Sequence, residues 1–88
     1  MNQIMKMKYI KIYSDGHNHY IVHNTNKDFP IGHTHIDNFN TAKYVATLAL
    51  HHKIPQPNHI SKYLIRSLMR ISTDKEYITK LNNLLKEK

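Results

Sequence analysis

Residues 8–23 read Lys-Tyr-Ile-Lys-Ile-Tyr-Ser-Asp-Gly-His-Asn-His-Tyr-Ile-Val-His, and this stretch decides the fold. Residues 8–13 alternate between apolar and polar side chains and are rich in strand-forming Ile and Tyr. Asp15-Gly16 follows, which is a strong sequence signal for a tight hairpin turn. Residues 17–23 then alternate again. The stretch therefore predicts a β-hairpin with its turn at Asp15-Gly16.

A two-residue turn would also fix the pairing of the two strands. The predicted cross-strand pairs are Ser14–His17, Ile12–His19 and Ile10–Ile21. Because cross-strand partners lie on the same face of a sheet, His17 and His19 are expected on the isoleucine side, which faces the core. The other face is expected to carry Tyr9, Lys11, Tyr13, Asn18 and Tyr20.

The rest of the chain predicts one more strand and three helices. Residues 24–32 have the composition of a loop, and residues 33–36 could form a short third strand. Helices are expected over residues 40–53, over residues 59–71 with Asn58 as the cap, and from the capping box Thr73-Asp74-Lys75-Glu76 to about Lys86. The order of elements predicts an α+β domain in which three helices pack on one face of a sheet.

Size and charge restrict the function further. The 88 residues make one domain, 1–88, with no cysteine and a net charge of +7. This charge favours an anionic partner such as nucleic acid, a nucleoprotein or an acidic protein surface, although a basic surface can also serve solubility alone. The sequence shows no signal-peptide run and no apolar stretch that could cross a membrane, so we expect a cytoplasmic protein without membrane contact.

Two Gly-His-x-His stretches point to a metal site. They place His17 and His19 in one segment and His33 and His35 in the next. Side chains two residues apart on a strand share a face, and four imidazoles from neighbouring segments could hold a structural Zn²⁺. Alternatively, His17 and His33 are exposed turn residues and His19 hydrogen-bonds to backbone at the edge of the core.

A second candidate surface is basic and aromatic. Lys62, Arg66 and Arg70 lie four residues apart and would form one row on the second helix, which could follow a phosphate backbone. Tyr13 and Tyr20 could stack on bases or anchor a protein interface. The alternatives are a solvated outer helix face and tyrosines that a dimer partner covers.

The order His23, Asn38 and then His51 or His52 resembles the HNH-type nucleases. That resemblance implies a metal-dependent nuclease with these residues around the metal. The chain departs from the family pattern because Val22 stands where an acidic residue usually precedes the first histidine. It also departs because the interval between Asn38 and the second histidine is longer than usual.

Taken together, the two Gly-His-x-His stretches in one small basic α+β domain resemble the phage-encoded anti-CRISPR inhibitors. The resemblance implies a non-enzymatic protein in the cytoplasm of the host cell that docks on a Cas effector, with a structural metal as in some of these inhibitors. Many anti-CRISPR proteins are acidic DNA mimics, whereas this chain is basic. The alternative functions are a nucleic-acid-binding regulator and an HNH-like nuclease, and a homodimer is a further candidate assembly.

Overall fold

The computed structural model describes residues 1–87 and has a four-stranded antiparallel sheet followed by three helices. The strands lie side by side in chain order. Their bounds are β1 Asn2–Met7, β2 Ile10–Ser14, β3 Tyr20–Asn24 and β4 His33–Ile36. The helices are α1 Phe39–His51, the short 3₁₀ turn η1 Pro57–His59, α2 Lys62–Arg70 and α3 Lys75–Glu87. The predicted α+β class is confirmed.

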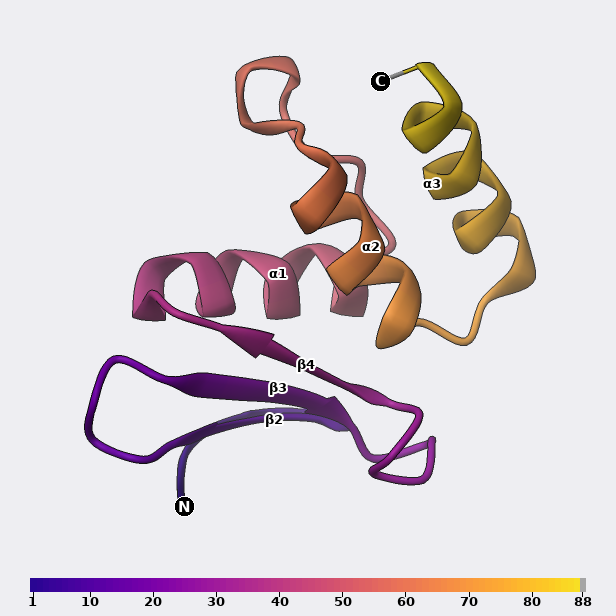
Figure 1. Cartoon of the computed structure of the whole chain (residues 1–88). Helices are drawn as coiled ribbons and strands as arrows, with labels where there is room; N and C mark the ends of the chain where they lie inside the picture. The colour runs from indigo at the N-terminus through magenta and orange to yellow at the C-terminus, as the bar shows by residue number, and fades with distance from the viewer. Residues whose placement is uncertain (88) are drawn as a thin grey trace.

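The helices lie on one side of the sheet, as Figure 1 shows. The core between the two layers is built from buried aliphatic side chains of β2, β3, β4 and the helices, with Tyr77 of α3 also buried. We call the sheet surface that faces these helices the core face. The opposite surface, which we call the outer face, is not covered by any helix of the described residues. No helix within residues 1–87 is long and apolar enough to cross a membrane.

The register predicted for the hairpin is wrong. Ile12 pairs with Val22 instead of His19, a shift of three residues (22 − 19), and a five-residue loop, residues 15–19, replaces the two-residue turn. Because side chains alternate between faces, a shift by an odd number moves every side chain of β3 to the opposite face. The observed pairing places Val22 beside Ile12 on the core face, where both are fully buried. Burial of these two side chains thus outweighs the local preference of Asp-Gly for a tight turn.

The five-residue loop is stabilised by its own polar groups. The carboxylate of Asp15 accepts a hydrogen bond from the backbone N–H of His17 at 2.8 Å. Gly16 and Asn18 both have positive φ angles, of 84° and 56°. Glycine adopts this conformation freely, and asparagine does so more readily than most residues. These two residues allow the chain to reverse direction without a two-residue turn.

Other boundaries also differ from the prediction. β1 was not expected, whereas the third strand over residues 33–36 is confirmed as β4. The helix predicted over residues 59–71 begins only at Lys62, because Ser61 and not Asn58 caps it. In the same way, Asp74 and not Thr73 caps α3, by accepting from the backbone N–H of Tyr77 at 2.9 Å.

Side chains of α2 cover the free edge of β4. The hydroxyl of Tyr63 donates to the carbonyl of His35 at 2.6 Å, and Nε of Arg70 donates to the carbonyl of His33 at 2.7 Å. Tyr63 and Arg70 are seven residues apart on the helix, so they lie on the same face two turns apart. An exposed strand edge invites pairing with other chains, and these contacts occupy its acceptors.

Candidate functional site

The outer face carries two rows of side chains across the four strands. The pairing of partners places Lys6, Lys11, His23 and His33 in the first row, which we call the basic row. The second row contains Gln3, Tyr13, Ile21 and His35. Neither row contains an acidic residue. The uncovered face of the sheet is thus basic and aromatic.

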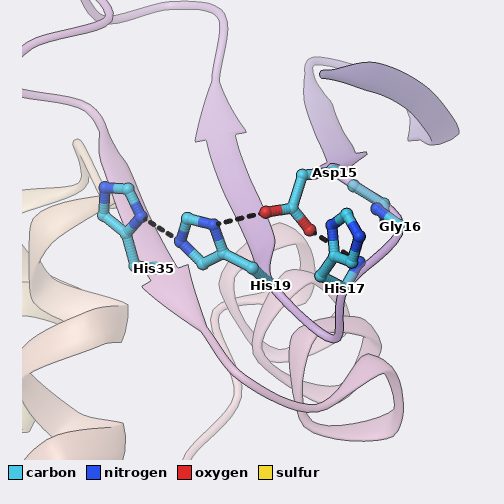
Figure 2. A network of polar contacts seen from close by, with 6 residues as sticks. Asp15, Gly16, His17, His19 and His35 are labelled. Carbon is cyan, nitrogen blue, oxygen red and sulfur yellow. Dashed lines mark hydrogen bonds and ion pairs between the residues drawn. The ribbon is translucent and has the colours of Figure 1, made fainter.

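Three histidines meet at one end of the outer face and form what we call the imidazole chain. Nε2 of His19 lies 2.7 Å from Nδ1 of His35, and Nε2 of His35 lies 3.2 Å from Nε2 of His33. At one end, Nδ1 of His19 contacts the carboxylate of Asp15 at 3.3 Å, as Figure 2 shows. At the other end, Nδ1 of His33 donates to the carbonyl of Phe29. His35 is thus the middle ring of the chain.

Proton counting limits how many contacts of the imidazole chain can be hydrogen bonds at the same time. Four hydrogen bonds run from Asp15 to the Phe29 carbonyl, and each bond needs one proton. Three neutral imidazoles carry only three N–H protons, because neutral imidazole has one donor and one acceptor nitrogen. All four contacts are therefore hydrogen bonds at the same time only when the three rings share one added proton.

The surroundings of His35 disfavour its protonated form. Burial lowers the pKa of His35 below its usual value, and the charges of His33, His19 and Arg70 lower it further. These surroundings favour the neutral form of His35, in which one ring nitrogen donates a hydrogen bond and the other accepts one. Nδ1 of His19 lies 3.3 Å from the carboxylate of Asp15, which can accept a hydrogen bond from this ring.

Asp15 supplies the negative charge at this end. The hydrogen bond from the backbone N–H of His17 is the largest cause that lowers the pKa of Asp15, and His19 lowers it further, whereas desolvation opposes both. Asp15 therefore remains ionised at neutral pH and holds the ring of His19.

The four histidines predicted to bind zinc are only partly brought together. His19, His33 and His35 meet, but His17 lies on the side of Asp15 away from His35 (Figure 2). His17 contacts Asp15 through its backbone N–H. The two nitrogens of His35 face different partners, and one imidazole cannot direct both nitrogens at a single ion. Within residues 1–87 no group of three or more His, Asp or Glu is arranged to hold a metal ion. The zinc site stays a prediction.

The predicted aromatic patch is divided by the observed register. Tyr13 lies on the outer face opposite Ile21, but Tyr20 pairs with Ser14 and Ile36 and lies on the core face. There its ring contacts Phe39, with 5.7 Å between the ring centroids. Tyr9 also packs against the core. Tyr20 therefore lies on the opposite face of the sheet from Tyr13, and the two tyrosines do not form one patch on the outer face.

The predicted basic row of α2 is also incomplete. Lys62 and Arg66 are exposed. Arg70 is exposed as well, but its guanidinium donates to the carbonyls of His33 and Pro30, at 2.7 and 3.3 Å. Arg70 thus joins α2 to the sheet, which leaves Lys62 and Arg66 as the side chains of this row directed to solvent.

The residues that resemble an HNH site lie apart. Asn38 caps the first turn of α1 and His51 ends the same helix, so the length of a 13-residue helix, roughly 20 Å, separates them. His52 stacks on Tyr77, and His23 contacts the carbonyl of Lys27 from the outer face. These four side chains do not share one site.

Two residues of this surface were missed by the sequence reasoning. Lys6 belongs to a strand that was not predicted, and Phe29 lies in a segment interpreted only as loop. The alternation of Met5, Lys6 and Met7 was a weak signal for the strand, whereas nothing in the sequence pattern placed Phe29 beside His33. In comparisons with known proteins, no family model, no curated protein and no solved structure matches this chain.

Proposed function

We propose that this protein is a non-enzymatic nucleic-acid-binding protein that contacts phosphates through the outer face of its sheet. The observation that carries the proposal is the direct pairing of Lys6 with Lys11 on that face. Like charges directly opposite one another destabilise a sheet, and a bound phosphate between them relieves the repulsion. His23 and His33 continue the same row. Both nitrogens of His33 already contact neighbouring groups, and so does Nε2 of His23, so the two lysines carry the proposed phosphate contacts.

The net charge of +7 favours a polyanion over a single small anion. A chain of phosphates can contact several positions of the basic row at once, and each contact releases counterions from the nucleic acid. The outer face is favoured over the face of α2 because Arg70 is already bound to backbone carbonyls. Docking on a Cas effector stays a prediction that depends on the resemblance to anti-CRISPR proteins.

A salt titration of oligonucleotide binding tests this function. The double variant Lys6→Gln/Lys11→Gln removes two charges from the outer face, and the matched double variant Lys62→Gln/Arg66→Gln removes two from α2. We expect the first pair to reduce the slope of log affinity against log salt by about 1 to 2, and the second pair to leave it nearly unchanged. The reverse result would assign binding to α2. Absence of salt-dependent binding in the unmodified protein would reject the proposed function.

A further inference from the structure

Phe29 is an exposed aromatic residue in a loop that backbone contacts hold firmly. The carbonyl of Asp28 accepts from the backbone N–H groups of Ile31 and Gly32 at 3.1 and 2.9 Å. Arg70 donates to the carbonyl of Pro30 and His33 donates to that of Phe29. The residue at 32 must be glycine, because a Cβ there would lie 2.4 Å from Cβ of Lys27.

The ring of Phe29 is positioned by two histidines of the outer face. It stacks on His33 with 4.2 Å between ring centroids and 5° between the planes. The ring of His23 meets it edge-on, with 5.1 Å between the centroids. Nevertheless Phe29 remains 45% exposed. An apolar ring that is both exposed and held in one orientation loses little conformational freedom when a ligand binds to it.

Phe29 also lies at the end of the basic row. His33 is the last residue of that row, on β4, and Lys6 is the first, on β1. Neighbouring strands lie about 4.8 Å apart, so the row spans roughly 14 Å across the sheet. A nucleic-acid strand whose phosphates follow this row would pass beside the Phe29 ring.

We infer that Phe29, stacked on His33, is a platform for an unpaired base, and that the ligand of the outer face is single-stranded nucleic acid. The inference rests on the proposed function. In a duplex the faces of the bases are covered by their neighbours, whereas a single strand can place a base on an aromatic side chain. Every base has such a face, so the platform is tolerant of sequence.

The test compares oligonucleotides that carry the same charge. The probes are labelled oligo(dT) and oligo(U) of about 20 nucleotides, an abasic strand of equal length and a matched duplex. Phe29→Ala is expected to weaken binding of the two single strands by roughly 5- to 100-fold. Binding of the abasic strand and of the duplex is expected to change little, and so is the salt slope for single strands, because the phosphate contacts remain. A difference between oligo(dT) and oligo(U) distinguishes DNA from RNA as the preferred source.

Two further variants make the result specific. Ile31→Ala removes another exposed apolar side chain of the same loop, one that is 61% exposed, and is expected to leave all affinities unchanged. The chain contains six tyrosines but no tryptophan, so Phe29→Trp places a single tryptophan at the platform, which can be excited selectively. We expect Phe29→Trp to retain binding and its fluorescence to be quenched by single strands. Thermal unfolding of each variant verifies that the fold is intact.

The outcomes separate this inference from the proposed function. If Phe29→Ala weakens binding of single and abasic strands equally, or if saturating single strand leaves the Phe29→Trp fluorescence unchanged, the base platform is overturned while phosphate binding stands. If the unmodified protein binds no oligonucleotide at low salt, both fail. Phe29 and Ile31 then indicate a surface for a protein partner.

Discussion

His19 and His35 are joined through Nε2 and Nδ1 at 2.7 Å, although 16 residues separate them in the sequence. The contact links the β2–β3 loop to β4 and continues to His33. Which of the two rings donates in this contact depends on their tautomers. The surroundings of His35 oppose the addition of a proton to this ring, because burial and the neighbouring charges of His33, His19 and Arg70 lower its pKa.

This arrangement predicts that acid destabilises the protein from near neutral pH. The folded protein holds the pKa of His35 below its usual value of 6.5, so the unfolded chain binds the proton more readily. The contribution of His35 to the free energy of unfolding is therefore complete above pH 6.5 and decreases as the pH falls through the lowered pKa. Urea unfolding at about pH 7.5, 6.5 and 5.5 is expected to show a falling midpoint.

Two matched histidine variants test whether this pH dependence comes from His35. His35→Gln is expected to flatten the change in midpoint between pH 7.5 and 5.5, whereas His51→Gln, at an exposed position in the last turn of α1, is expected to retain it. Protonation of Asp15 also destabilises the folded protein, but only at lower pH, because the pKa of this carboxyl is lowered below its usual value of 3.8. An equal pH dependence in His35→Gln and in the unmodified protein would contradict the role of His35.

Because Arg70 contacts the edge of β4 and Arg66 does not, we expect substitution of the two arginines to affect the stability of the protein differently. Arg70→Ala removes the donor to the carbonyl of His33 and is expected to lower the free energy of unfolding by about 1 kcal/mol, since the contact is partly solvated. Arg66 is exposed on the same helix, so Arg66→Ala is expected to change the free energy of unfolding by less than about 0.5 kcal/mol. Urea unfolding of both variants measures the difference, and equal losses would show that Arg70 does not stabilise the edge.

The sequence predicted the fold class and part of the site. The features that were predicted are those that depend on patterns within one segment of the chain. Alternation of side chains predicted the hairpin, and apolar stripes at helical spacing with capping residues predicted the three helices. The short strand β4 was predicted over residues 33–36. The register depended on whether Asp15-Gly16 forms a two-residue turn, and a five-residue loop that buries Val22 beside Ile12 competes with it. Such competition is decided by packing between distant segments, which local patterns do not contain.

The candidate site was likewise predicted only in part. The histidine doublets predicted that rings of the two segments would meet, and His19, His33 and His35 do meet. Their bonding could not be predicted, because it depends on the register that places His35 between the other two rings. Lys6 joins the basic row only through the pairing of β1 with β2, and this strand has a weak pattern of its own.

We expect substitution of the buried Asn24 to lower the stability of the protein more than substitution of an exposed asparagine. Its side chain is 2% exposed and donates to the carbonyl of Ile71 at 2.9 Å, which ties β3 to the segment between α2 and α3. Asn24→Ala leaves that carbonyl without this donor and is expected to cost about 2 kcal/mol of unfolding free energy. Asn26→Ala, at an exposed neighbouring position, is expected to cost less than about 0.5 kcal/mol. Urea unfolding tests both, and a small loss for Asn24→Ala would mean that water replaces the amide.

Zinc binding can be predicted from the geometry of the donors. A structural zinc ion takes four ligands, and the Nε2 atoms of His33 and His35, 3.2 Å apart, supply two. His19 faces the other nitrogen of His35 and cannot join the same ion without a rotation of that ring. If the rings keep this arrangement, elemental analysis of purified, untagged protein gives well below one zinc per chain, and thermal unfolding changes little on addition of a chelator. One zinc per chain that is lost in the double variant His17→Ala/His19→Ala, but retained in the control His51→Ala, would instead establish the four-histidine site predicted from the sequence.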